Sequence, residues 1–242
     1  MIILNLGAGT KVSTHREVIN VDWSIYFKIK KSPILNYIAQ IFVEGDRLQR
    51  LNSIGDNIIV HDLSKGIPFD SDSIDVVYHS HFLEHLERDA AKLFLKEVRR
   101  TLKPNGIQRI IVPDFEQLCK EYLDHIRYCE GNLDAFRNHD IYIQNIIEQI
   151  VRKEGVGTQM QKPFFRHLEN LIRGDARKRG ETHQWMYDRF NLKSLLAELN
   201  FKNIMVQNYY SSSIPDWNRF GLDLDKNGNE DKKRSLYMEA EK

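Results

Sequence analysis

Seven short apolar runs recur along the chain, and each ends at a glycine or at polar side chains. Runs of this length that are rich in isoleucine and valine are typical of strands buried on both faces, as in a parallel sheet. No other feature constrains the fold as strongly. The runs are residues 2–6, 18–21, 57–60, 74–78, 108–112, 201–206 and 235–240.

Helical periodicity fills several segments between these runs. Apolar residues recur every three or four positions at 91–102 and 192–199, and shorter patterns at 118–126 and 141–151 indicate two more helices. Strands that alternate with helices predict an α/β fold. We therefore expect a Rossmann-like, doubly wound, mostly parallel seven-stranded sheet.

Two connections depart from regular alternation. Only eight residues separate Gly9 from Val18, too few for an ordinary crossover helix, so the first helix is expected to be short or missing. The stretch from 112 to 201 is longer than one helix can use. We interpret 115–183 as a helical insertion, a lid over the carboxyl ends of the strands, within a single domain of residues 1–242.

The charge balance narrows the functional classes. Lys and Arg number 35 and Asp and Glu 34, a formal charge of +1, which argues against a bulk nucleic-acid binder. No stretch approaches the roughly 20 apolar residues of a membrane span, and the N-terminus lacks the basic start of a signal peptide. We expect a cytoplasmic protein without stable membrane insertion, in which Cys119 and Cys129 are reduced helix residues that point apart.

The segment 25–43 has the residue pattern of an amphipathic helix. Within 25–43, three lysines precede an apolar stripe at 34–42. We expect this stripe to cover the sheet; the alternative is that it rests on a membrane surface.

A glycine turn and two acids mark the carboxyl edge of the expected sheet. Gly7-Ala8-Gly9 follows the first strand directly, where glycines let the backbone approach a ligand closely. Asp22 ends the second run, where a carboxylate can accept both hydroxyls of a ribose, and Asp62 ends the third. Val12 stands where a dinucleotide fingerprint has its third glycine. The alternative is that each aspartate only caps a turn.

An ordered series of motifs resembles class I S-adenosylmethionine-dependent methyltransferases, and most of all a type-11-like subgroup associated with polysaccharide biosynthesis. The departure at Asn5, where many members carry an acid, concerns the end of the site that takes the amino acid. The motifs are Leu4-Asn5-Leu6-Gly7-Ala8-Gly9, Ile19-Asn20-Val21-Asp22, His61-Asp62-Leu63, His81-Phe82-Leu83-Glu84-His85, Ile110-Ile111-Val112-Pro113-Asp114 and His183-Gln184-Trp185-Met186-Tyr187-Asp188.

The resemblance implies a cofactor, S-adenosylmethionine, and a set of contacts with it. It places the backbone of Gly7, Ala8 and Gly9 against the methionine part and Asp22 on the ribose, with Trp23 flanking the adenosine. It further implies that Asp62 and the Leu63 backbone meet the adenine, and that the backbone near His79 reaches the sulfonium.

Three histidines are candidates for a general base. Histidine titrates near neutral pH, and a hydroxyl acceptor needs a base whereas an amine needs little more than loss of a proton. His79, His81 and His85 are these candidates, and Glu84 is suited to orient a histidine. His183 is expected to reach the acceptor pocket from the insertion, and the predicted catalytic residues are His79, His81 and His183. The alternatives are packing at the start of a helix for His81, His85 and Glu84, and a polar cap with a core tyrosine around His183. No metal site is predicted.

The insertion carries an excess of positive charge. Residues 151–182 hold eight basic residues against four acids, a net +4. We interpret this excess as favouring an anionic small-molecule acceptor; the alternative is a solvated basic loop. An unchanged acceptor KM after replacement of Arg166 and Arg173 by alanine would refute the anionic acceptor.

Together these patterns predict an S-adenosylmethionine-dependent methyltransferase that acts on a small acceptor, such as a sugar hydroxyl or amine in glycan or secondary metabolism. Two alternatives stay open at this point. One is a non-catalytic module that binds a nucleotide or S-adenosylmethionine, and the other is an NAD-dependent oxidoreductase. The sequence does not determine the acceptor or the oligomeric state.

Overall fold

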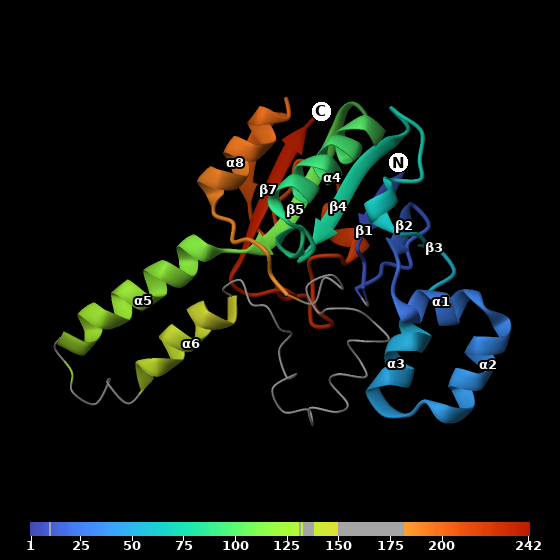
Figure 1. Cartoon of the computed structure of the whole chain (residues 1–242), viewed down its shortest axis with the longest axis horizontal. Helices are drawn as coiled ribbons and strands as arrows, with labels where there is room; N and C mark the ends of the chain where they lie inside the picture. Colours follow the sequence, from blue (N-terminus) through green and yellow to red (C-terminus); the bar gives the residue numbers. More distant parts are fainter. Residues whose placement is uncertain (10, 131, 133–137, 150–181) are drawn as a thin grey trace.

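A single sheet organises the computed structural model, which describes residues 1–9, 11–130, 132, 138–149 and 182–242. Its seven strands have the order β3-β2-β1-β4-β5-β7-β6 (Figure 1). The strands are β1 (Ile3–Leu6), β2 (Val18–Asp22), β3 (Ile58–Val60), β4 (Ile74–Ser80), β5 (Leu102–Pro113), β6 (Lys202–Gln207) and β7 (Ser235–Glu241).

The predicted doubly wound, mostly parallel sheet is confirmed. β1 to β5 pair in parallel, and β7 runs antiparallel to both β5 and β6. The strand order reverses at β1, which lies between β2 and β4. In open α/β sheets ligands bind outside the carboxyl ends of the strands at such a reversal.

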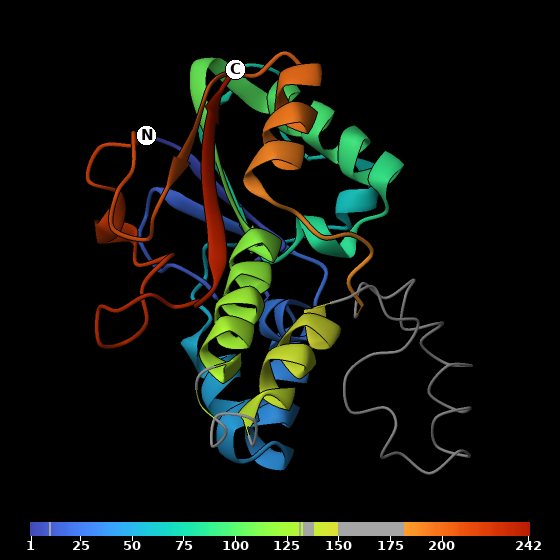
Figure 2. The same ribbon diagram turned by 90° about the vertical axis from the view of Figure 1, so that its left-hand side faces the viewer.

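Helices α4 (Arg88–Thr101) and α8 (Arg189–Glu198) cover one face of the sheet (Figure 2). Each presents an apolar face at helical spacing, as the sequence predicts, and α8 starts at a capping box between Asp188 and Asn191. The core on this face is continuous from β2 to β7. Its central members are Leu4, Leu6, Val77, Leu95, Val98, Ile110, Leu192, Leu196 and Met238.

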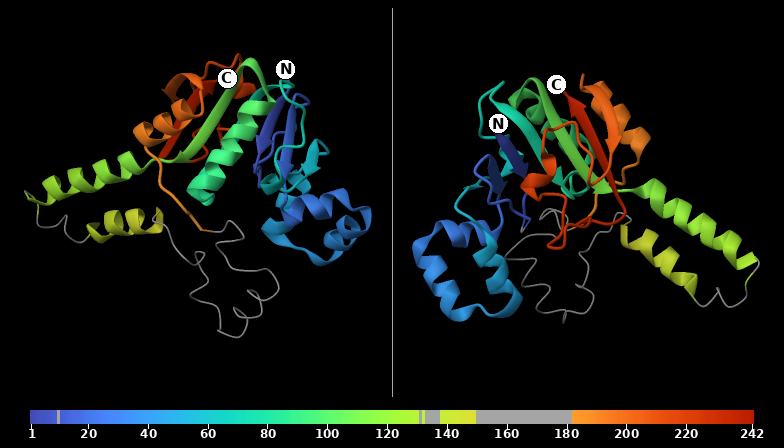
Figure 3. Two further views of the ribbon diagram at one scale, coloured as in Figure 1. Left: turned by 45° about the horizontal axis from the view of Figure 1, so that its top comes forward. Right: turned by 180° about the vertical axis from the view of Figure 1, so that it is seen from behind.

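The opposite face is covered by the connection between β6 and β7 rather than by crossover helices. This connection contains the short 3-10 helix η5 (Trp217–Phe220), which lies in front of the sheet in the right-hand view of Figure 3. Trp217, Phe220 and Leu222 pack against Ile3 and Tyr78 of the sheet. The late part of the chain thus supplies the layer that an ordinary helix between β1 and β2 would have provided.

An asparagine ladder explains how β1 and β2 connect without that helix. Asn5 Nδ2 donates to Asn20 Oδ1 (3.0 Å) and to the Lys11 carbonyl (2.9 Å). Asn20 Nδ2 and Asn57 Nδ2 both donate to the Ser13 carbonyl, at 3.0 and 2.8 Å. Buried side-chain amides therefore satisfy backbone groups that a helix would have paired internally.

Arg109 anchors the β6–β7 connection from inside the core. Its guanidinium is fully buried and contacts Asp223 (2.7 Å) and Glu239 (2.6 Å). It also donates to the carbonyl oxygens of Asn208 (2.8 Å) and Ser211 (3.0 Å). One side chain therefore ties β5 and β7 to the start and the middle of the covering segment.

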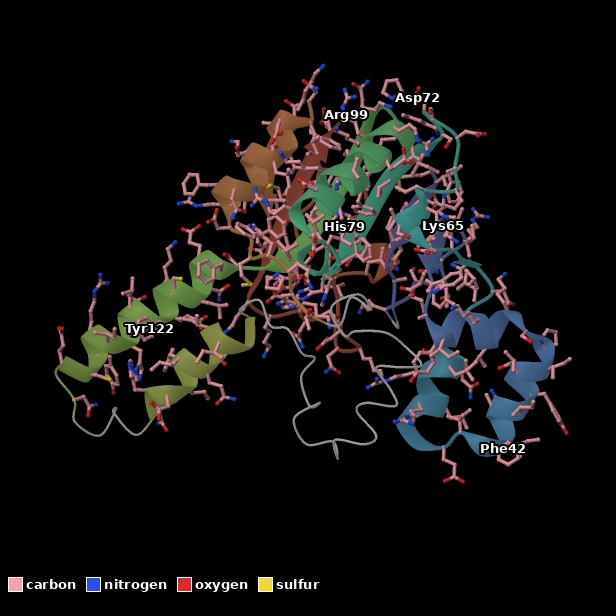
Figure 4. All side chains as sticks on the ribbon, in the orientation of Figure 1. Phe42, Lys65, Asp72, His79, Arg99 and Tyr122 are labelled. Carbon is pink, nitrogen blue, oxygen red and sulfur yellow. The ribbon has the colours of Figure 1, made fainter. Side chains whose placement is uncertain are left out.

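The apolar stripe at 34–42 does not cover the sheet, contrary to the sequence prediction. The segment breaks at Ser32-Pro33 into α1 (Ile25–Lys31) and α2 (Pro33–Phe42), followed by α3 (Gly45–Ser53). Phe27 of α1 is buried, but Ile34 and Phe42 are 73% and 78% exposed. Figure 4 shows Phe42 at the outer corner of this helical group. The break turns α2 away from the sheet, and contact with a membrane surface stays a prediction.

Helices α5 (Phe115–Glu130) and α6 (Asp140–Gln149) form an arm that extends away from the sheet (Figure 1). The predicted insertion is helical here, whereas its action as a lid stays a prediction. The basic stretch lies outside the described residues except for Thr182 at its end. Across the described ranges, no helix is both long and apolar enough to cross a membrane.

Candidate active site

The glycine turn lies at the reversal of strand order. Gly7 and Gly9 adopt left-handed φ values of +63° and +54°, and the amides of Gly7 and Ala8 both donate to the Val21 carbonyl, at 2.9 and 3.3 Å. The turn thereby folds back over the end of β2 and brings Gly9 beside Asp22. The sequence predicted that the glycine turn and Asp22 lie together at this edge of the sheet, and the structure places them there.

The two glycines serve different purposes. A Cβ on Gly7 would lie 2.3 Å from the Phe82 ring, whereas a Cβ on Gly9 would meet no described atom within 4 Å. Gly7 is therefore required by packing against the protein itself. Gly9 has the open face that a ligand could approach.

We expect Gly7→Ala to destabilise the protein by about 2 to 4 kcal/mol, because it adds an internal clash to left-handed strain. Gly9→Ala carries only the strain, about 1 to 2 kcal/mol, and serves as the matched control. Urea unfolding of both variants measures the difference. Equal losses would show that the Phe82 ring moves aside freely.

Asp22 holds the turn together. Its Oδ2 accepts from the Gly9 amide (2.7 Å), and its Oδ1 accepts from the Ser24 amide (2.6 Å). A carboxylate has about four acceptor positions, so two remain for ribose hydroxyls. Trp23 is 53% exposed, with Lys28 Nζ 3.6 Å from the centre of its ring.

Asp62 caps the short 3-10 helix η1 (Leu63–Lys65). Its Oδ1 accepts from the amide (3.0 Å) and the hydroxyl (2.7 Å) of Ser64. The hydroxyl contact is the main reason that the pKa of Asp62 lies below its usual range. Asp62 therefore caps a turn in this structure, and contact of Asp62 and Leu63 with an adenine stays a prediction.

His79 lies in the core rather than in the site, and here the sequence prediction needs correction. Its ring is fully buried beneath α4 (labelled in Figure 4) and contacts Phe94 at 5.2 Å between centroids and Gln108 Nε2 at 3.0 Å. Burial lowers its pKa to about 3. A ring in this position cannot reach an acceptor, so it does not qualify as the base; contact of its backbone with the cofactor stays a prediction.

The structure gathers the other histidines around Glu84. Glu84 belongs to the 3-10 helix η2 (Leu83–His85) and is fully buried. His81 Nδ1 lies 3.5 Å and His85 Nε2 3.9 Å from Glu84 Oε1, and a His183 ring nitrogen lies within 4.8 Å of the other ligand atoms of Glu84 and His85. We call these four residues the Glu84 cluster. Neither carboxyl oxygen has a hydrogen-bond partner among the described residues.

Burial shifts the titration of this cluster. Removal from water raises the pKa of Glu84 to about 8 and lowers those of His81 and His85 to about 3 and about 4. Near neutral pH the histidines are therefore uncharged and Glu84 is mostly protonated. A cation could enter the cluster only by displacing that proton, and we assign none there.

The segment that follows the insertion completes the site. The amide of Gln184 donates to the Glu84 carbonyl (2.6 Å), and the amide of Phe115 donates to the Tyr187 carbonyl (3.1 Å). These bonds fix His183 beside His85, with ring centroids 4.8 Å apart. Tyr187 is buried, which raises its pKa to about 12. Asp188 caps α8, as expected from the alternative of a polar cap with a core tyrosine.

Asp114 also lies at this edge of the sheet. It follows β5, bridges to Tyr187, and accepts from the Gln117 amide (3.2 Å) at the start of α5. Burial raises its pKa. Asp114 therefore joins the α5–α6 arm to the sheet at this edge.

Comparison with known proteins bears on the activity of this site. Residues 13–110 match a methyltransferase domain. The matched segment includes Asp22, Asp62 and most of the Glu84 cluster, whereas Gly7 precedes it and His183 follows it. The predicted enzyme class is confirmed over this methyltransferase segment, and the predicted cofactor, S-adenosylmethionine, agrees with it. The match does not distinguish the polysaccharide-associated subgroup. No curated protein matches the chain.

Solved structures of similar shape include SAM-dependent methyltransferases from Archaeoglobus fulgidus and Methanosarcina mazei. The chain is 14% and 17% identical to them, covers 85% and 91% of their lengths with 99% of its own, and reaches a TM-score of 0.43 with each. Another is a Burkholderia thailandensis 1,6-didemethyltoxoflavin-N1-methyltransferase with bound S-adenosylhomocysteine, at 14% identity, 100% and 70% coverage and a TM-score of 0.45. Because these TM-scores are below 0.5, we infer nothing further about this protein from these structures.

Proposed function

We propose that this protein transfers a methyl group from S-adenosylmethionine to a hydroxyl of a small acceptor, such as a sugar. The Glu84 cluster carries the proposal. Three imidazoles around a buried carboxyl, at the carboxyl edge of the sheet, form a group that can accept a hydroxyl proton, which an amine acceptor would hardly need.

The cofactor site in this proposal follows the carboxyl edge. The exposed backbone of Gly9 faces the methionine part, and the free acceptor positions of Asp22 take the ribose hydroxyls. Trp23 flanks the adenine, and Asp62 and the Leu63 amide contact the edge of the adenine ring. The loop contacts of Asp22 support this arrangement, because they hold the carboxylate in place before a ligand arrives.

The bound sulfonium supplies a leaving group that is already activated. The protein aligns the acceptor oxygen with the methyl group and removes the hydroxyl proton. We assign this step to His81 and His183, the two members of the cluster that the sequence predicts as catalytic. His81 Nε2 contacts the Ser235 hydroxyl (2.9 Å), and His85 Nδ1 donates to the Thr182 carbonyl (3.3 Å). Glu84 is a positioning residue behind them, a buried and mostly uncharged carboxyl near neutral pH whose Oε1 lies 3.5 Å from His81 Nδ1.

The cofactor assignment is tested by titrating S-adenosylhomocysteine into an Asp22→Ala variant. Loss of charged hydrogen bonds costs about 1.5 to 3 kcal/mol, so we expect about 10- to 150-fold weaker binding by calorimetry. Asp56→Ala, at an exposed position near β3, is the control. Because Asp22 also holds the loop, Asp22→Asn provides a milder variant, and thermal melts show whether each is folded.

Three results would contradict the proposal. Unchanged affinity in a folded Asp22→Ala variant would refute the cofactor site. Binding of NAD in preference to S-adenosylhomocysteine would favour the oxidoreductase. Tight binding without turnover on any hydroxyl or amine acceptor would favour the non-catalytic module.

A further inference from the structure

A second group of metal-binding side chains lies outside the active site, on the α5–α6 arm. His125 and Cys129 are four residues apart on α5, a spacing that puts both on one face of the helix. His139 immediately precedes α6 and faces them from the other side of the arm. The ligand atoms of all three lie within 4.8 Å of one another.

The three ligand atoms converge on one point. His125 Nδ1 lies 3.0 Å from His139 Nδ1 and 3.5 Å from Cys129 Sγ. A single N–H proton on His125 can be directed at only one of these neighbours at a time. The remaining neighbour, either His139 Nδ1 or Cys129 Sγ, then faces His125 Nδ1 without that proton between them. A cation would satisfy this arrangement.

We propose that His125, Cys129 and His139 bind a zinc ion that fastens α5 to α6. Imidazole and thiolate are the ligands that Zn²⁺ prefers in proteins. Bonds of about 2.0 to 2.1 Å to nitrogen and about 2.3 Å to sulfur imply tetrahedral edges of about 3.3 Å between nitrogens and about 3.6 Å between nitrogen and sulfur. The observed 3.0 and 3.5 Å lie close to these edges.

Aromatic neighbours hold the two imidazoles in position. The Tyr142 ring stacks on His125, with centroids 4.1 Å apart at 21°, and the Tyr122 ring lies 5.6 Å from that of His139. Figure 4 labels Tyr122 on α5. Each ligand ring therefore rests against a tyrosine of the opposite helix, which limits its rotation.

The arm needs such a fastening because it buries few apolar side chains. Leu118 is the buried residue described for α5, and Ile141, Ile143 and Ile147 of α6 are 55%, 38% and 48% exposed. A helical pair with so small a core gains little from hydrophobic burial alone, and metal ligation is a common substitute.

A groove borders two of the three proposed ligands. Ile126, Glu130 and Asp140 line this groove together with Cys129 and His139. No fourth histidine, cysteine or carboxylate of the described part of the chain joins the group. Water therefore completes the tetrahedron, and the neighbouring acids favour a cation there.

The test is metal binding by the untagged, full-length protein. We expect one Zn²⁺ per chain after dialysis, and with Co²⁺ in place of zinc an absorption band from thiolate-to-metal charge transfer. Cys129→Ser and His139→Ala should each weaken Zn²⁺ binding by at least about 100-fold and abolish the band. Chelation should accelerate hydrogen exchange in α5 and α6 while the sheet is unaffected.

Cys119→Ser is the matched control, since Cys119 lies on the same helix outside the group. It should retain both the stoichiometry and the band. The proposal is overturned if wild type binds no zinc, if Cys119→Ser and Cys129→Ser bind equally, or if the Co²⁺ complex lacks a thiolate band. None of these results depends on methyl transfer, so they are independent of the proposed activity.

Discussion

An Arg109→Leu variant is expected to lose about 3 to 5 kcal/mol of stability, much of the 5 to 15 kcal/mol typical of a domain. The substitution leaves the carboxylates of Asp223 and Glu239 buried without their cation. It also removes donors from the Asn208 and Ser211 carbonyls, so the segment that covers one face of the sheet loses its anchor. Urea unfolding followed by fluorescence measures the change, because Trp217 lies within this segment.

Arg127→Leu is the control for this prediction. Its ion pair with Asp124 is exposed on the arm, where both side chains are more than two-thirds accessible. Such pairs contribute about 0 to 1 kcal/mol. A loss of less than about 1 kcal/mol in Arg109→Leu would mean that water enters and replaces the guanidinium, and would refute its role as an anchor.

Replacing Glu84 by glutamine is expected to lower kcat by about 10²- to 10⁴-fold above pH 8, where the ionised carboxyl of wild type would stabilise an imidazolium. Near neutral pH, where Glu84 is itself uncharged, we expect a loss of less than about 10-fold. Binding of S-adenosylhomocysteine should stay within a few-fold of wild type, since Glu84 is not assigned to the cofactor. The exposed neighbour Glu87 provides the control substitution, Glu87→Gln. Equal loss of cofactor affinity and kcat would instead indicate a general structural defect.

The same variant should gain stability at alkaline pH. Burial raises the pKa of Glu84 to about 8 in the folded protein, so the folded state holds this proton more tightly than the unfolded chain. The stability of wild type therefore falls as the pH rises from the unfolded pKa through about 8, whereas Glu84→Gln lacks this term. We expect an advantage of about 2 to 4 kcal/mol at pH 8.5 and less than about 1 kcal/mol at pH 5.

Thermal melts of both proteins across this pH range give the result directly. An advantage that does not depend on pH would show that Glu84 is not protonated in the folded state. Lower activity together with higher stability would identify Glu84 as a residue kept for function at the expense of stability.

The sheet was predictable because its evidence is local. Runs such as Ile74–Tyr78 must be buried on both faces, and the short interval from Gly9 to Val18 leaves no room for a helix. The position of Asp22 at the end of a strand likewise follows from chain order, since carboxyl ends of parallel strands share one edge. The roles of His79 and of the apolar stripe in α2 were misjudged, because periodicity does not say which layer receives a side chain.

Chain order and residue type alone determined the strands, the glycine turn with its acids, and the methyltransferase resemblance. Only the tertiary structure brought Glu84 and His183 together, buried Arg109 between Asp223 and Glu239, and set His139 opposite His125 and Cys129. Each of these groups joins residues far apart in the chain or separated by a loop, and such contacts are fixed by packing and burial. Those same forces determine the charge that each group carries, so the sequence could name the candidates whereas the structure decided which can act as acid, base or ligand.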